Sequence, residues 1–201
     1  MLSAPPSRPW RSCSPQPPLA PSNFPTATSS SRAIRDSDGK KVDEYLSNKA
    51  MRIVNTRDKG TGDAAIHIVT KRSDALYLRA LLQNEDINPN LQDRDGNTAL
   101  ILAADRNWDD GIAILIRYHA NVNVANSSGE TPLIRAVQRH NTNIATTLLA
   151  AGADPDKADL IAGMSARDYA RTDTRAPASL VRLLAGAAKV QRKANVAGPK
   201  L

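Results

Sequence analysis

The chain is poor in aromatic residues, with two Trp, four Tyr and one Phe among 201 residues. Any core must therefore come from Leu, Ile, Val and Ala, which suits small helices in shallow layers better than a thick globular core. A single cysteine, Cys13, excludes an intramolecular disulfide and a cysteine-based zinc site. No apolar run approaches the roughly 20 residues that span a bilayer, so membrane insertion is not expected.

The chain has a net charge of +7, and this excess positive charge is confined to its two ends. Residues 1–32 and 186–201 together carry seven basic side chains and no acidic one. The remaining 27 − 7 = 20 basic side chains lie in residues 33–185, together with all 20 acidic ones. A neutral folded part makes nucleic acid an unlikely class of partner, and leaves binding through the basic tails as a less favoured alternative.

One sequence pattern recurs four times along the chain. Its anchor glycines, spaced 34, 33 and 34 residues apart, are Gly62, Gly96, Gly129 and Gly163. Apolar residues after each glycine recur with a helical period in two successive segments, so each unit is predicted to hold two short helices. The predicted second helices are 75–83, 111–119, 143–152 and 179–186.

Local chemistry supports the predicted helices. Thr98, Thr131 and Ser165 each stand before a first helix, where a side-chain oxygen can accept from its free amides. Pro132 falls in a first turn, where its missing N–H costs nothing. Gly152 can take the left-handed conformation that ends a helix. Because one such unit cannot bury its apolar face alone, neighbouring units are expected to stack.

Several motifs are typical of one family. Residues 131–133 read TPL, residues 103–104 are paired alanines, and residues 148–154 read LLAAGAD. The chain resembles the ankyrin-repeat proteins, whose unit is about 33 residues of β-turn plus two helices. The resemblance covers about residues 33–188 and implies an all-α ankyrin-repeat solenoid, in which stacked helix-turn-helix units are joined by β-turn or hairpin loops. The looser outer repeats favour a bacterial-type member.

The predicted domain organisation has three parts. A Pro/Ser-rich tail, residues 1–32, is expected to be disordered, and residues 189–201 form a flexible basic tail. Between them lies the repeat domain, 33–188. Its predicted parts are a capping half-repeat, 33–58, and repeats at about 59–92, 93–125, 126–158 and 159–188.

The polar segment TSSSR at residues 28–32 shortens the helix expected before Ala33, which raises a second hypothesis for the tail. With suitable codons, a one-base shift of reading frame converts the end of the tail into the helix-forming SDSYIFLK, so residues 1–32 would be a frame artefact. The chain is expected to be cytoplasmic as written, and periplasmic or exported if this hypothesis holds. The coding DNA tests it directly.

Four residues depart from the pattern or invite a functional reading. His119 takes the helix-ending glycine position of the second repeat, so a strained turn is expected there. Arg167 replaces an apolar residue of the fourth repeat, which suggests a half-exposed terminal unit. His67 is expected to bond backbone groups within the stack. His119 and His140 are expected to be exposed at helix ends.

No residue pattern indicates catalysis. The three histidines have no metal-binding spacing with one another or with the cysteine, and no phosphate-binding loop, GxSxG or GxGxxG motif occurs. The segment DRDG at 93–96 lacks the other ligands of a calcium loop and is predicted to be a turn. We therefore expect no catalytic residue, no cofactor, no metal and no small-molecule substrate.

An arginine follows three anchor glycines by ten residues, at Arg72, Arg106 and Arg139. The family resemblance places these arginines at the ends of first helices beside the concave groove. Stacking would align them, with Lys71, into an electropositive ladder for an acidic segment of a protein partner. The alternative is that these cations only complement helix dipoles.

The turn tips complete the predicted partner-binding surface, because ankyrin-repeat proteins commonly use these tips. The tip residues are Arg94, Asp95, Asn97, Ser127, Ser128 and Glu130. The resulting prediction is a non-enzymatic protein–protein interaction module. An accessory or inhibitory subunit of a separately encoded enzyme, using the same surface, is the alternative.

Overall fold

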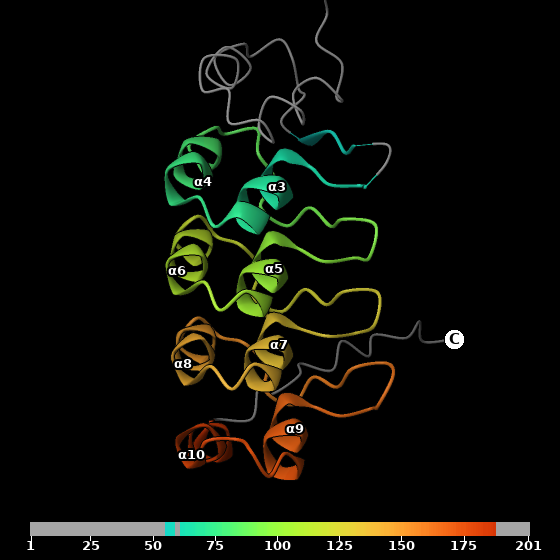
Figure 1. Ribbon diagram of the computed structural model, residues 1–201, viewed down its shortest axis with the longest axis vertical. Helices are drawn as coiled ribbons and strands as arrows, with labels where there is room; N and C mark the ends of the chain where they lie inside the picture. The colour runs from blue at the N-terminus through green and yellow to red at the C-terminus, as the bar shows by residue number, and fades with distance from the viewer. Residues whose placement is uncertain (1–54, 59–60, 188–201) are drawn as a thin grey trace, which may run out of the picture.

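The helices of the chain form two columns of stacked elements (Figure 1). In the computed structural model, which describes residues 55–58 and 61–187, the first helix of each repeat lies in one column and the second helix in the other. The loops between repeats project beside the first-helix column. An all-α solenoid is thereby confirmed. The predictions for residues 1–54 and 189–201, both tails and most of the half-repeat among them, lie outside the described residues.

The first-helix column is built as the sequence predicts. Its members are α3 (Ala65–Arg72), α5 (Ala99–Asp105), α7 (Pro132–Gln138) and α9 (Ala166–Thr172). Thr98 Oγ1 accepts from the Ile101 N–H at 3.3 Å, and Thr131 and Ser165 cap α7 and α9 in the same way. Pro132 is the first residue of α7. All three predicted hydroxyl caps are present.

The second-helix column contains α4 (Ala75–Leu82), α6 (Asp109–Arg117), α8 (Thr142–Ala150) and α10 (Ala178–Gly186). Asp74 and Asn141 are the N-cap residues of α4 and α8, and their side-chain oxygens accept from backbone N–H groups of the first turn. Helix α6 begins two residues before its predicted start. Its first turn is Asp109 and Asp110, which favour a helix N-terminus although they add nothing to the apolar pattern.

The core lies between the two columns and is aliphatic. No aromatic side chain is among its largest fully buried members within the described residues, which are Ile66, Leu78, Leu81, Leu100, Ile101, Ile112, Leu115, Leu133, Ile134, Ile144, Leu148 and Leu180. Ala103 and Ala136 are completely buried between first helices, and their small side chains let α5 and α7 approach closely. The aliphatic core predicted from the composition is confirmed.

Each loop is a tight turn stacked on its neighbours. Asp93 N–H donates to the Asn97 carbonyl at 2.9 Å, so DRDG is a turn as predicted. Gly129 has φ +81°, and a Cβ there would lie 2.5 Å from the Leu160 nitrogen. The close approach exists because the Leu160 N–H donates to the Ser128 carbonyl of the previous loop at 2.9 Å. Glycine at this position is required both by conformation and by space.

His119 ends the second helix of its repeat in the left-handed conformation. Its φ is +61°, and Gly152 at the corresponding position of the next repeat has φ +89°. A non-glycine residue in this conformation costs roughly 1–2 kcal/mol. The strained turn predicted at His119 is therefore present, and the N–H groups of His119 and Ala120 donate to the Ile116 and Leu115 carbonyls of α6.

Arg167 corrects one prediction, because it is buried rather than half-exposed, with 8% of its surface accessible. Its Nε donates to Asp156 Oδ1 at 2.7 Å, and its terminal nitrogens donate to the carbonyls of Leu184 and Ala187. The charge is buried at low cost because a carboxylate and helix-end carbonyls surround it. The polar substitution that is exposed lies at Arg171, where α7 has the buried Val137.

Candidate protein-interaction surface

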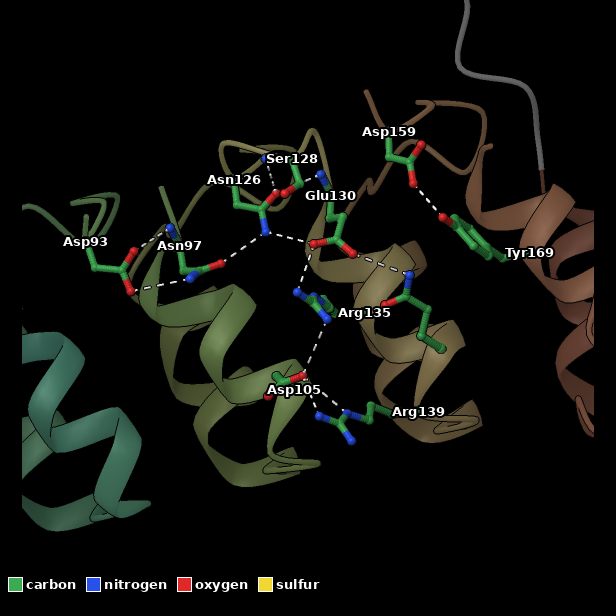
Figure 2. Close-up of polar contacts among 11 residues, drawn as sticks. Asp93, Asn97, Asp105, Asn126, Ser128, Glu130, Arg135, Arg139, Asp159 and Tyr169 are labelled. Carbon is green, nitrogen blue, oxygen red and sulfur yellow. Dashed lines mark hydrogen bonds and ion pairs between the residues drawn. The ribbon is translucent and has the colours of Figure 1, made fainter. Parts of the chain in front are cut away.

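The side of the molecule that carries the first helices and the loops is here called the loop–helix face, and Figure 2 shows polar contacts in part of it. Arg72 is the last residue of α3, while Arg106 and Arg139 are the C-cap residues of α5 and α7. All three are exposed, and α5 packs against both α3 and α7. The structure thus places the three arginines, here called the arginine ladder, at equivalent ends of successive first helices.

Arg139 and Lys71 have acidic neighbours that sequence reasoning did not include. Arg139 Nη2 lies 2.7 Å from Asp105 Oδ1 of the preceding helix, and Lys71 Nζ lies 2.7 Å from Asp63 Oδ1. Asp105 also lies 3.9 Å from Arg135 (Figure 2). Such exposed pairs contribute little to stability. The side chain of Arg139 remains 49% exposed, so it can still contact a partner.

Asn126 is the centre of a hydrogen-bond network that joins two loops (Figure 2). Its Oδ1 accepts from the backbone N–H of Ser128 and of Glu130, at 3.0 and 2.9 Å. Its Nδ2 donates to Asn97 Oδ1 at 3.1 Å and to Glu130 Oε2 at 2.9 Å. Arg135 completes the network with a 2.8 Å contact to Glu130. Three predicted tip residues, Asn97, Ser128 and Glu130, therefore also hold the loops in place.

Asp93, Asn126 and Asp159 open successive loops and are all buried. Each accepts hydrogen bonds from loop amides, as Asp159 Oδ1 does from the Ala162 N–H at 2.9 Å. Burial opposes ionisation of Asp159, but the hydrogen bonds from the Tyr169 hydroxyl and the loop amides outweigh it, and the pKa of Asp159 is lowered. Sequence reasoning missed these residues. Their signal was an Asp or Asn three or four positions before each anchor glycine.

The loop tips differ from repeat to repeat. Arg94, Asp95 and Ser127 are exposed, as predicted. The fourth tip is apolar instead, with Leu160 and Ile161 exposed to 78% and 80%. Adjacent, strongly exposed aliphatic side chains are unusual on a surface and commonly mark an interaction site. Sequence reasoning missed them, although an apolar pair two positions before the turn glycine Gly163 was a visible signal.

The histidines divide into three environments. His67 is fully buried: its Nδ1 accepts from the Ala64 N–H at 3.0 Å and its Nε2 donates to the Leu91 carbonyl at 2.9 Å. The predicted backbone role of His67 is thus confirmed. Burial lowers the pKa of His67, although the bond to Leu91 opposes this effect. His119 is exposed, as predicted.

His140 does not fit the expectation of an exposed helix-end residue. It is half-buried, and its Nε2 lies 2.6 Å from Asp173 Oδ2 of the next repeat. The stacking of repeats brings the two residues together although they are 33 positions apart. This hydrogen bond is the main reason that the pKa of Asp173 is lowered.

Residues 55–58 and 61–187 contain neither a metal-binding cluster of side chains nor a membrane-spanning helix. In these ranges, no three His, Cys, Asp or Glu side chains are grouped so that they could hold a metal ion. No helix there is long and apolar enough to cross a membrane.

A stack of helix pairs in which each repeat packs on the next defines a class, the repeat proteins. A family model for ankyrin repeats (3 copies) matches residues 31–124 and 66–159, and the chain belongs to the ankyrin-repeat family. The repeats of this family generally mediate protein–protein interaction, and the family is typically non-enzymatic.

Curated relatives match part of the chain. A probable serine/threonine-protein kinase of Dictyostelium discoideum is 33% identical over 46% of this chain and 11% of its own length. An IkB-like protein of African swine fever virus is 30% identical over 59% of this chain and 53% of its length. The B-cell lymphoma 3 protein homolog of Mus musculus is 28% identical over 52% and 24%. The chain thus covers at most about half of these relatives, and a bacterial source stays a prediction.

Proposed function

We propose that the chain is a non-enzymatic interaction module that binds an acidic segment of a protein partner on its loop–helix face. The arginine ladder supports this proposal most directly. Three exposed guanidinium groups stand at equivalent positions of adjacent repeats, so an extended segment with regularly spaced carboxylates would meet each in turn. Opposite charges arranged in this way speed association and select the register of the segment.

The hydrogen bonds of the loops support a binding surface that is already ordered before a partner docks. Asn126 and Asp93 hold the loop backbones through bonds to their own turn amides, and the Asn126–Asn97 bond joins adjacent loops. A surface ordered before binding loses little conformational entropy on docking. The tip residues Arg94, Asp95 and Ser127 then present side chains from fixed positions.

The apolar tip makes the two ends of the proposed binding surface chemically different. Leu160 and Ile161 lie in the loop before α9. Of the labelled first helices, α9 is the most distant from α3 (Figure 1). A partner that places acidic side chains along the ladder and an apolar group against this tip would bind in one orientation only. Burial of the two side chains is expected to contribute roughly 1.5–3 kcal/mol each.

The test of the ladder is a triple substitution, Arg72→Glu, Arg106→Glu and Arg139→Glu. We expect the dissociation constant for the partner captured from the native organism to rise by at least about a hundredfold, because attraction becomes repulsion at three points. Titration calorimetry at 0.05 and 0.15 M salt would measure the affinity and its salt dependence, and circular dichroism would verify folding.

A control protein carries Arg175→Glu and Arg182→Glu, which lie beside and on α10. Both side chains are exposed, so the control should retain folding and partner affinity. Equal affinity of the triple variant and the wild type would reject the ladder. A partner whose enzymatic activity changes on binding would favour the accessory-subunit alternative. Nucleic-acid binding that survives loss of the repeats would favour the basic tails.

A further inference from the structure

A pocket lies on the second-helix column, between α4 and α6, away from the residues of the proposed loop–helix surface. Its volume is about 250 Å³. The lining residues are Arg79, Asp110, Ala113, Ile114, Arg117 and Tyr118. The volume falls below the range of about 300–1,000 Å³ typical of pockets for drug-sized ligands. It is well above the roughly 30 Å³ of one water molecule, so a single side chain is the matching size.

The pocket carries more positive than negative charge. Arg79 on α4 and Arg117 on α6 supply two guanidinium groups, and Asp110 supplies one carboxylate. Among the residues that the structure describes, no salt bridge or side-chain hydrogen bond joins either arginine to another residue. Guanidinium groups bind carboxylates in a planar, bidentate manner, so this site fits an anion better than a cation.

The charges are specific to this junction and are not repeated along the stack. In the next groove, between α6 and α8, the positions equivalent to the two arginines and the aspartate are uncharged. These equivalents are Ala113, Ala150 and Asn143, and Ala151 stands in place of Tyr118. If the arginines only provided solubility, a charge of the same sign would serve equally well at either junction. Their convergence on one cavity indicates a binding role.

The apolar part of the lining defines the rest of the ligand. Ile114 is only 6% exposed, and Tyr118 and Ala113 supply the other apolar atoms of the lining. A ligand with methylene groups beneath its carboxylate would cover these atoms. Asp110 can accept a hydrogen bond from a backbone N–H next to the acidic side chain.

We propose that this pocket binds a glutamate side chain of a protein segment, with its carboxylate on Arg79 and Arg117 and its backbone N–H on Asp110. The site is separate from the arginine ladder, and the proposal does not depend on the function proposed for the loop–helix face. It gives the chain a second point of attachment on its other column, so one molecule could link two partners.

The test uses the full chain and three probes, followed by ¹⁵N–¹H correlation spectra. The probes are the blocked peptides Ac-Ala-Glu-Ala-NH₂ and Ac-Ala-Gln-Ala-NH₂, and free glutarate. We expect the glutamate peptide to shift the amides of Ala113, Ile114 and Tyr118 saturably. The glutamine peptide, which lacks the charge, should not reach saturation. The double variant Arg79→Gln, Arg117→Gln should weaken glutamate-peptide binding at least about tenfold.

Two control variants distinguish this site from general attraction to a basic chain. Arg182→Gln, at an exposed position of α10, should bind the glutamate peptide as the wild type does. Asp110→Ala removes the acceptor and should weaken binding of the peptide relative to glutarate, which has no N–H to donate. Absence of saturable shifts, or unchanged binding by the double variant, would overturn the proposal. Tighter binding of glutarate than of the glutamate peptide would instead assign the pocket to free carboxylates.

Discussion

At the scale of the residue, His67 shows how stacking gives one ring a defined tautomer. Its Nδ1 accepts from the Ala64 amide while its Nε2 donates to the Leu91 carbonyl, so the proton is on Nε2. A second proton on Nδ1 would face the Ala64 N–H donor and break that bond. Burial lowers the pKa of His67, whereas the nearby Asp63 and Asp93 raise it and Lys71 lowers it.

This environment predicts a loss of stability in acid. In the unfolded chain His67 titrates near the ordinary value of 6.5, above its pKa in the folded protein. Between these values the unfolded state binds more protons, so the free energy of unfolding decreases as the pH falls through about 6.5. Urea unfolding at pH 7.5, 6.5 and 5.5 would show the midpoint falling.

The substitution His67→Gln should lower the stability at pH 7.5 and remove much of this pH dependence. The matched control is His119→Asn, at an exposed site whose left-handed backbone asparagine tolerates. The control should retain the wild-type slope between pH 5.5 and 6.5. An unchanged slope in His67→Gln would show that other groups dominate in this range.

At the scale of the element, Arg167 links the two helices of the last described repeat. It lies on α9, and its guanidinium nitrogens donate to the Leu184 carbonyl in α10 and to the Ala187 carbonyl just beyond it. The last carbonyls of a helix have no partner within the helix. Arg167 therefore satisfies the end of α10 from a neighbouring element, and Asp156 fixes the guanidinium at 2.7 Å.

The variant Arg167→Met keeps the apolar stem but removes these bonds. We expect α10 to lose roughly 1.5–3 kcal/mol of local stability, the usual contribution of hydrogen bonds to a charged group. Hydrogen exchange of the α10 amides, such as those of Leu183 and Leu184, would report the loss. Arg171→Met, one turn further on and exposed, is the control. Equal exchange in the two variants would contradict a capping role for Arg167.

At the scale of the whole molecule, the repeats are joined by their cores and by their loops. The first helices α5 and α7 pack together, and the loops preceding them share the bond from Asn126 to Asn97. Each repeat contacts only its neighbours, so the stability of the stack depends on these shared contacts. The same contacts set the spacing of the proposed binding residues.

A double-mutant cycle would measure this coupling between loops. We expect Asn97→Ala and Asn126→Ala to interact by about 0.5–1.5 kcal/mol in urea unfolding, the net contribution of one hydrogen bond. Asn97→Ala and Asn141→Ala form the control cycle, because Asn141 caps α8 and bonds to Asn107 instead. The control pair should be additive to within about 0.5 kcal/mol. Additivity in both cycles would mean that the loops stack without mutual stabilisation.

Much of the fold was predictable because its determinants are local and recur. The capping hydroxyls Thr98 and Thr131, the proline at the start of α7 and the turn glycines act within a few residues of their own position. Repetition at intervals of 33 or 34 residues then turns each local pattern into a stack. The residues of the arginine ladder align because they recur at the same intervals of 34 and 33 residues.

The sequence by itself determined the repeat, its two helices and its aliphatic core, since each depends on residue type and period alone. Only the tertiary structure decided which polar groups meet. Stacking of repeats brings Asp105 to Arg139 and Asp173 to His140, and packing within the fourth repeat brings the Leu184 carbonyl of α10 to Arg167. Side-chain charge is visible in a sequence, but whether a neighbour already neutralises it depends on distance in space.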